Sequence, residues 1–279
     1  MITKIIRVLV ITILICFSFY YTEKSVDMLK DADPVMKDLK SNINSFEVKS
    51  INSKIDNDVI LPGYNGLDVD IEKSYQNMKR VGKYIESRVV LKETSPTISI
   101  KDNYNKYIIK GNYLKDSVAL VFDLDEIKDI NRLVKILDDK NVIATFITSK
   151  NYLENNQKTI YTLAANDHEI ELKTESENDL VLMRNTLKNI INYSGEYCYT
   201  NKKNAQVLKT CEKAHMHTII PTFSVSYFKE LKQKLESGAI IKINNNEINE
   251  LPTIINYIKQ RGYNLDNIFD LLSEDRVEK

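Results

Sequence analysis

The sequence has few of the residues on which unusual chain architectures depend. Its 279 residues include no Trp, 3 Cys, 5 Pro and 7 Gly. Three cysteines are too few for a disulfide framework. Scarce Gly and Pro, together with 43% apolar residues, exclude a linker or a disordered tail. The chain must therefore fold around a hydrophobic core, and its length predicts one large domain or one domain with a smaller companion.

A net charge is also absent, because 39 Lys and Arg residues balance 39 Asp and Glu residues. Affinity for nucleic acids comes largely from positive charges that neutralise phosphates. We therefore expect no nucleic-acid partner.

The first apolar run predicts a membrane helix. Residues 5–21 carry one charge, Arg7, and would form a helix about 25 Å long, slightly shorter than the roughly 30 Å hydrocarbon layer. Lys4 and Arg7 lie at its start, whereas four acidic and two basic residues follow it up to Asp33. The excess of basic residues before the run predicts a cytoplasmic N-terminus. We expect a single-pass protein of the cell membrane whose main domain is extracytoplasmic.

Two alternatives to an uncleaved anchor stay open. A cleaved signal peptide normally ends in small residues, which residues 19–22 do not provide. Lipid attachment at Cys16 would need a small residue before it, where Ile15 stands. The uncleaved anchor is the favoured interpretation.

Composition predicts four segments along the chain. Residues 1–23 form the cytoplasmic tip and the anchor, and the charged residues 24–47 suit a stalk. Residues 48–114 combine short β-rich runs with one helix capped by Asp70, which indicates a small α+β accessory domain. Residues 115–279 form the largest segment and carry a different pattern.

That pattern alternates apolar strands with amphipathic helices. Strand candidates begin near residues 117, 142, 168, 196, 217, 239 and 263. A strand and a crossover helix that repeat about every 25 residues predict a parallel α/β sheet or barrel. Such folds place their chemistry at the carboxyl ends of the strands.

The residues at these strand ends resemble those of the polysaccharide deacetylase (NodB homology) family. The resemblance extends over about residues 116–274 and rests on four blocks in the family's order. These are Val118–Phe122 followed by Asp123-Leu124-Asp125-Glu126, then Val142–Ile147, then Asp167–Leu172 followed by Lys173–Glu177, and finally Ser237–Asn245 with Leu251–Ile255 and Arg261–Tyr263. The resemblance implies an irregular (β/α) barrel.

The resemblance also implies roles for individual positions. Family members use a divalent metal, held by one Asp and two His, to activate water against an N-acetyl group, with a second Asp as base and a further His as acid. The base position falls on Asp123 and is intact, whereas the Asp ligand falls on Leu124. The two His ligands fall on Lys173 and Glu177, and the acid His falls on Asn244. An Arg-Pro motif of the family is missing around residues 197–200.

These losses predict a pseudoenzyme that keeps the scaffold and needs no cofactor. We expect a membrane-anchored glycan-binding or scaffolding protein that holds cell-wall glycan or peptidoglycan and organises an envelope protein partner. Lys173 is expected to pair with Asp123 or Glu177 and so to replace the metal's charge. The alternative is a solvated loop lysine.

Further interpretations assign catalytic, metal-binding or disulfide-forming roles to other residues. Asp123 and Asp125 would share one face if the strand continued, and Glu177 would complete a rebuilt zinc site of an active N-deacetylase. His168 is expected to be structural. His215 and His217 share a face, but no nearby Cys or His pair completes a zinc site. Cys198 and Cys211 form a disulfide or are two buried apolar residues.

Overall fold

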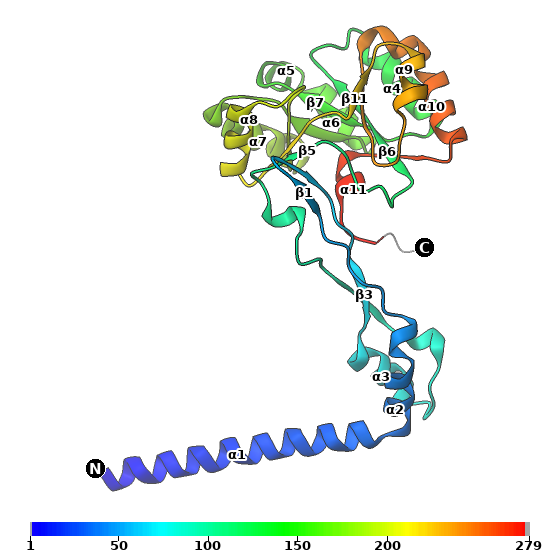
Figure 1. The fold of residues 1–279 in the computed structure, drawn as a ribbon. Coiled ribbons are helices and arrows are strands. Elements are labelled where there is room, and N and C mark those ends of the chain that lie inside the picture. Colours follow the sequence, from blue (N-terminus) through cyan, green and yellow to red (C-terminus); the bar gives the residue numbers. More distant parts are fainter. Residues whose placement is uncertain (1, 277–279) are drawn as a thin grey trace. The chain divides into compact units, whose positions relative to one another are not determined.

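The computed structural model describes residues 2–276, which divide into two compact units. The small unit comprises residues up to Lys49 together with Gly66–Thr94, and the α/β unit comprises Ser50–Asn65 and the residues from Ser95 onward. Figure 1 shows the elements of both. This division differs from the predicted boundaries at residues 48 and 114. The predicted stalk shares a core with part of the predicted accessory domain, and the rest of that domain extends the large sheet.

The small unit holds three helices and a two-stranded antiparallel sheet, and its apolar core is formed by residues of α2, β3 and α3. Tyr75 packs with buried side chains of α2, and its hydroxyl donates to Asp33 at 2.9 Å. The other carboxylate oxygen of Asp33 accepts from the backbone N–H of Val35 at 2.8 Å and caps α2. The elements are α1 (Ile2–Ala32), α2 (Pro34–Asn42), η1 (Ile43–Ser45), β3 (Gly66–Val69), α3 (Ile71–Lys79), η2 (Glu86–Arg88) and β4 (Leu91–Thr94).

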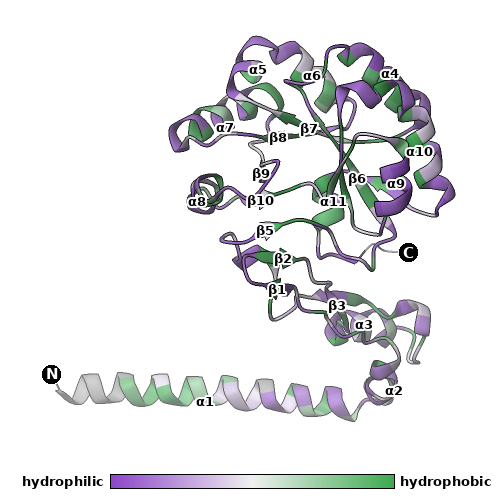
Figure 2. Cartoon of the chain, turned by 45° about the horizontal axis from the view of Figure 1, so that its top comes forward, coloured by the Kyte–Doolittle hydropathy of each residue, from purple (hydrophilic) through white to green (hydrophobic). Residues whose placement is uncertain are grey.

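Helix α1 contains the predicted membrane segment. Within the described part of the chain, Leu9–Ala32 is the single helix long and apolar enough to cross a membrane, a criterion that a signal sequence also meets. The side chains described at positions 9–22 are exposed. Hydropathy changes along α1 from hydrophobic to hydrophilic toward Ala32 (Figure 2). An apolar surface of this kind suits a lipid environment.

The α/β unit is built on one curled sheet. Its strand order is β1-β2-β5-β10-β9-β8-β7-β6-β12-β11, and β13 pairs with the first half of β6. All neighbours in this sheet are parallel except β1 and β2. The strands are β1 (Lys54–Asp56), β2 (Val59–Leu61), β5 (Tyr107–Ile108), β6 (Ser117–Asp123), β7 (Thr145–Thr148), β8 (Glu169–Leu172), β9 (Tyr197–Tyr199), β10 (His217–Ile219), β11 (Phe223–Val225), β12 (Ile240–Ile243) and β13 (Asn264–Asp266).

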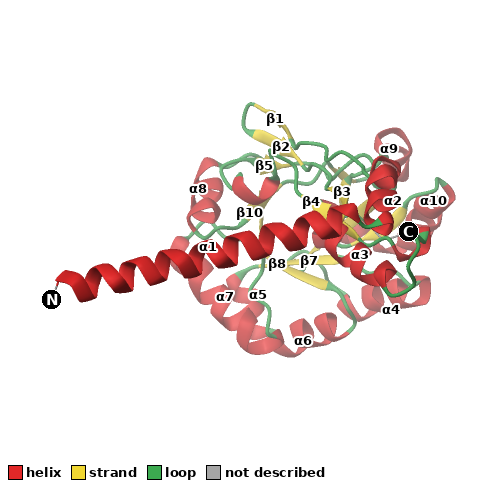
Figure 3. Cartoon of the chain, turned by 90° about the horizontal axis from the view of Figure 1, so that it is seen from below, coloured by secondary structure: helices red, strands yellow, loops and turns green. Residues whose placement is uncertain are grey.

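Helices cover the outer face of this sheet. In Figure 3, α4, α6, α7 and α8 lie outside the strands. The helices are α4 (Ile130–Lys140), α5 (Lys150–Asn155), α6 (Gln157–Ala165), α7 (Glu177–Ile191), α8 (Ala205–Lys213), α9 (Phe228–Lys234), α10 (Leu251–Gln260) and α11 (Ile268–Leu272), with short 3₁₀ turns η3 (Ile100–Asp102) and η4 (Asn245–Glu250). The predicted α/β class and barrel-like architecture are confirmed.

Strand β6 shows how the fold positions the strand ends. Every one of its residues is buried. Val118, Leu120 and Phe122 pack in the core beneath the outer helices, whereas Ala119 and Val121 pack in a second core inside the curled sheet. Because side chains alternate along a strand, Asp123 continues the inner set and lies at the carboxyl end of β6.

Helix α11 closes the inner core, and a buried glutamate holds it there. Ile268, Leu271 and Leu272 of α11 pack in the inner core. The Glu169 carboxylate of β8 accepts from the backbone N–H groups of Ile268 at 2.8 Å and Phe269 at 3.1 Å, and from the Thr145 hydroxyl at 2.5 Å. The helix N-terminus is thus satisfied inside the protein.

We expect the substitution Glu169→Gln to flatten the pH dependence of stability. Burial raises the pKa of Glu169 to about 7, whereas an unfolded glutamate titrates near pH ~4.3. The folded state therefore retains a proton that the unfolded chain has lost, and this stabilisation is full below about pH 4 and is lost as pH rises through about 7. Urea unfolding between pH 5 and pH 8 should show a loss of roughly 1–3 kcal/mol in the wild-type chain and a smaller one in the variant.

The matched control is Glu154→Gln, which changes an exposed glutamate on α5. This substitution should leave the dependence of the unfolding free energy on pH as it is in the wild-type chain. Glu171, whose pKa burial also raises, keeps part of the slope in the Glu169 variant. Equal slopes for wild type and Glu169→Gln would show that Glu169 does not titrate in this range.

Candidate functional site

A lysine and two aspartates meet at the carboxyl ends of β6 and β8. Lys173, the first residue after β8, places its Nζ 2.7 Å from both carboxylate oxygens of Asp123 and 3.1 Å from Oδ2 of Asp125. The backbone N–H of Asp125 donates to Asp123 at 3.2 Å, so the turn after β6 folds both carboxylates toward the same ammonium. Asp125 also accepts from the Ser149 hydroxyl at 2.7 Å. The predicted pairing of Lys173 with Asp123 is present.

Burial makes it costly to keep charged groups in this cluster and acts on the pKa of each member. The Asp123 side chain is 2% exposed, and burial raises the pKa of its carboxyl while Lys173 opposes that change. Burial alone would lower the pKa of Lys173, but its hydrogen bonds to the two aspartates raise it. Burial likewise acts to raise the pKa of Asp125, and hydrogen bonds from Ser149 and Lys173 lower it. Lys173 is therefore a cation that the site itself supplies.

The other predicted site residues lie outside this cluster. Leu124 is fully buried in the outer core, and its backbone N–H donates to the carbonyl of Ile147. Glu177 is the first residue of α7 and forms an exposed ion pair with Lys213 at 2.6 Å. Of the two partners expected for Lys173, the structure therefore shows Asp123 and not Glu177, whose side chain pairs with Lys213.

Asn244 follows β12 and is held by the neighbouring strand. Its amide donates to the carbonyl of Val225 at 3.1 Å. An amide has no proton to exchange near neutral pH. This position therefore contributes a structural hydrogen bond to β11 in the structure.

A second buried lysine was missed by the sequence analysis. Lys242 of β12 is 7% exposed in its side chain, and its Nζ lies 2.8 Å from Glu126 and 3.1 Å from the side-chain oxygen of Asn201. The Tyr199 hydroxyl donates to the same oxygen at 2.7 Å. The signal was present, because a lysine interrupts an otherwise apolar buried strand at a position that faces the inner core.

These contacts decide whether a catalytic metal fits. The ammonium of Lys173 stands at hydrogen-bonding distance from the carboxylates that a cation would need. Leu124 has no donor atom, and Glu177 is paired elsewhere. In residues 2–276, no group of three or more His, Cys, Asp and Glu side chains is placed to hold a metal ion. The residues at this site do not fit a metal held by one Asp and two His.

Three of the remaining candidate residues, His168, Cys198 and Cys211, have structural roles. His168 is buried, accepts from the backbone N–H of Ala144 at 3.3 Å, and contacts the ring of Phe146 edge-on. This agrees with its expected structural role. Cys198 of β9 and Cys211 of α8 form a disulfide, with Cα atoms 6.1 Å apart, and both are also buried in the outer core.

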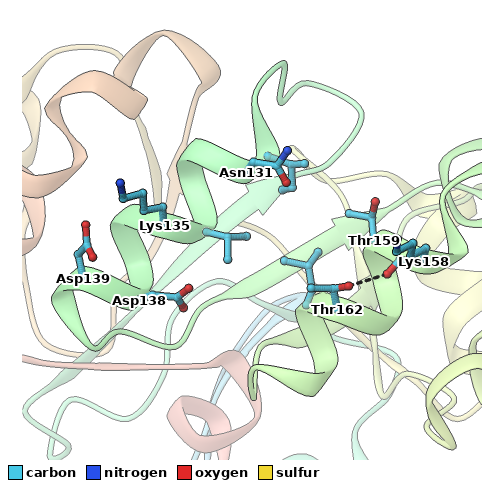
Figure 4. A pocket seen from close by; sticks show the side chains of 10 residues that line it. Asn131, Lys135, Asp138, Asp139, Lys158, Thr159 and Thr162 are labelled. Carbon is cyan, nitrogen blue, oxygen red and sulfur yellow. Dashed lines mark hydrogen bonds between the residues drawn. The ribbon is translucent and has the colours of Figure 1, made fainter.

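A groove on the outer surface holds none of the predicted site residues. It lies between α4 and α6, has a volume of about 480 Å³, and carries charges of both signs. Figure 4 shows Asp138 of α4 pointing toward Thr162 of α6, whereas Lys135 of α4 points away from that helix. Oppositely charged side chains along two neighbouring helices are typical of a solvated surface.

The sequence model of the polysaccharide deacetylase family matches residues 110–226. The chain is 26% identical, over 287 aligned positions, to the uncharacterized protein YlxY of Bacillus subtilis (strain 168), with 91% of this chain and 88% of that protein covered. This match extends well beyond the segment that resembles the family.

Solved structures show the same fold. Wild-type BA3943 from Bacillus anthracis, described as a CE4 family pseudoenzyme, is similar with a TM-score of 0.63 and 24% identity over 87% of this chain and 96% of that one. A mutant of BA3943, described as having restored enzymatic activity, gives a TM-score of 0.64 at 24% identity over 87% and 99%.

An active enzyme is more distant. The Bc1960 peptidoglycan N-acetylglucosamine deacetylase gives a TM-score of 0.54 at 18% identity over 61% of this chain and 95% of that one. The matched segment contains Asp123, Leu124, Lys173 and Glu177, which lie at or after the carboxyl ends of β6 and β8. Residues 110–226 therefore match the polysaccharide deacetylase family in sequence, in a degenerate form that lacks most of the metal-ligand and catalytic residues that the resemblance implies.

Proposed function

We propose that this protein is a membrane-anchored, extracytoplasmic, catalytically inactive relative of the polysaccharide deacetylases. It binds cell-wall glycan, with peptidoglycan as the favoured ligand, and serves as a scaffold for an envelope protein partner. The helix α1 is its anchor, with the N-terminus in the cytoplasm.

One observation carries the proposal. Lys173 Nζ stands 2.7 Å from both oxygens of Asp123, the position that matches the family's catalytic base. A carboxylate that is buried and paired with an ammonium is a weaker base toward a substrate water than one that is free of a cation. A lysine in this position also repels a divalent cation, so neither the activated water nor the polarised carbonyl of the family's chemistry is available.

Two further findings support it. The disulfide between Cys198 and Cys211 suits an oxidising compartment outside the cytoplasm. The CE4 pseudoenzyme BA3943 matches over nearly its whole length, and a mutant of that protein is described as active again, which means that the scaffold survives loss of its chemistry.

The test measures metal, acetate and binding on one preparation of the full chain in detergent. We expect no stoichiometric zinc after dialysis, no acetate released from peptidoglycan or from N-acetylglucosamine oligomers, and retention of the chain on insoluble peptidoglycan. Acetate release that a chelator abolishes would overturn the inactive assignment. Failure to bind peptidoglycan would overturn the glycan-binding one.

A second candidate function rests on the shared face of Asp123 and Asp125. The two carboxylates converge on one cation, as a rebuilt deacetylase site around Asp123 would need. The test of this candidate is Lys173→Met, which removes the ammonium and leaves Asp123 and Asp125 free to take a cation. Zinc bound at about one equivalent by the wild-type chain or by this variant would favour the candidate, whereas the main proposal expects none in either.

A further inference from the structure

A pocket opens at the end of the strands opposite to the Lys173 cluster. It has a volume of about 570 Å³, and residues at the amino ends of β9 and β10 line it together with η3 and α11. Because the strands are parallel, this end and the Asp123 end lie at opposite edges of the sheet. We call it the amino-end pocket. It is distinct from the site described above.

Aromatic rings dominate this pocket. Tyr104 stacks on His217 with ring centroids 4.4 Å apart and meets His215 edge-on at 5.4 Å. Tyr193, Tyr197 and Phe269 also line it. Aromatic faces of this kind bind apolar surfaces of ligands and retain a polar tip for hydrogen bonds.

His217 gives the pocket unused hydrogen-bonding capacity. Its side chain is more than nine-tenths buried, and its Nδ1 has no hydrogen-bond partner among residues 2–276. Burial lowers the pKa of His217 to about 4, so the ring is neutral at pH 7. A buried polar group without a partner is costly, and natural proteins rarely retain one without a structural or functional reason.

Most of the charged groups around the pocket have partners within the protein. Lys101 lies 3.9 Å from Asp275, and Arg184 donates to the backbone carbonyls of Ser194 at 3.3 Å and Ala214 at 3.2 Å. Glu274 is buried and accepts from Ser53 at 2.6 Å and the N–H of Gly63 at 2.8 Å. Both cations and this anion are already engaged within the protein, whereas the exposed carboxylate of Glu196 also lines the pocket. The pocket therefore offers aromatic rings and polar groups and does not favour an anionic ligand.

We propose that the amino-end pocket is a carbohydrate-binding subsite for an uncharged N-acetylated sugar unit. A pyranose ring has an apolar C–H face that suits Tyr104 and hydroxyl and amide groups that suit His217 and the neighbouring tyrosines. The choice of an N-acetylated sugar rests on the proposed function, whereas the location of the subsite rests on the residues that line the pocket. With this subsite the protein would hold a glycan strand away from its inactive centre.

The test is calorimetric titration of the full chain in detergent with the tetramer of N-acetylglucosamine. Tyr104→Ala should weaken binding at this subsite by about fivefold or more, since one well-placed aromatic contact is worth about 1 kcal/mol. Tyr104→Phe, which keeps the ring, should retain most of the affinity. Tyr161→Ala removes an exposed tyrosine from α6, outside the pocket, and should bind as the wild type does.

Several outcomes separate this inference from the proposed function. Loss in Tyr104→Ala with retention in Tyr104→Phe supports the subsite, provided that the thermal unfolding of both variants matches that of the wild type. Equal affinity of Tyr104→Ala and the wild type overturns the subsite and leaves the proposed function standing. Retention on insoluble peptidoglycan without any binding of the tetramer also overturns only the subsite.

Discussion

The substitution Lys173→Met should destabilise the α/β unit by about 3–5 kcal/mol, because it leaves two carboxylates without their cation. Asp123 is almost fully buried, and the ammonium 2.7 Å from both its oxygens is the neighbour that compensates its charge most directly. Without it, the carboxyl must either take up a proton or remain charged in an apolar site. Urea unfolding at pH 7, followed by circular dichroism, measures the change.

The matched control is Lys213→Met. Lys213 pairs with Glu177 at 2.6 Å, a contact as short as that of Lys173, but both side chains are more than half exposed. An exposed ion pair contributes about 0–1 kcal/mol, so this variant should unfold nearly as the wild type does. Comparable losses for the two variants would contradict a special role for the buried pair.

The double variant Asp123→Leu/Lys173→Met tests the cause. It removes the buried carboxylate together with its partner, and replacement of a buried ion pair by apolar side chains is often neutral or stabilising. We expect it to recover most of the stability lost in Lys173→Met. A double variant as unstable as the single one would mean that Lys173 acts through packing or through Asp125.

The pH dependence of the stability that this cluster provides follows from the pKa shifts of Lys173 and Asp125. The pKa of Lys173 is raised, so its stabilisation is present below its ordinary pKa near 10 and is lost as pH rises through the folded value. The pKa of Asp125 is lowered, so its stabilisation is present above about pH 4 and is lost as pH falls through its folded value. The cluster is therefore stabilising across neutral pH.

Removal of the disulfide by Cys198→Ala/Cys211→Ala should cost about 3 kcal/mol of unfolding free energy. The two cysteines are 13 residues apart, and the bond limits the conformational freedom of that loop in the unfolded chain. Both cysteines are buried in the outer core, so loss of the sulfur atoms adds a small packing cost. Urea unfolding with and without a thiol reductant measures the effect.

The reductant provides the internal control. It should lower the stability of the wild-type chain toward that of the double variant and leave the double variant unchanged. Cys16→Ala, which removes the free cysteine of α1, should change neither curve. A wild-type chain with the same stability in both conditions would show that the disulfide contributes little.

The sequence predicted the strands of the α/β unit because their apolar runs recur at regular intervals. Each of the seven predicted starts lies at most three residues before a strand of the sheet. The short strands β2 and β5 were assigned to a separate domain. They join the large sheet through parallel pairing of β5 with β10 and β2, and pairing between distant segments leaves no local signal in the sequence.

At the site, the sequence by itself determined what is missing. Leu124 has no ligand atom, the charged Lys173 has no lone pair for a metal, and Asn244 has no proton to exchange, whatever the fold does. Only the tertiary structure decided which of these residues meet. In the structure, Lys173 lies beside Asp123 and Asp125. Glu177 pairs instead with Lys213, and Lys242 is buried beside Glu126. The identity of a side chain fixes its chemistry, but a charge acts over a few ångströms, and those distances come from packing between strands far apart in the chain.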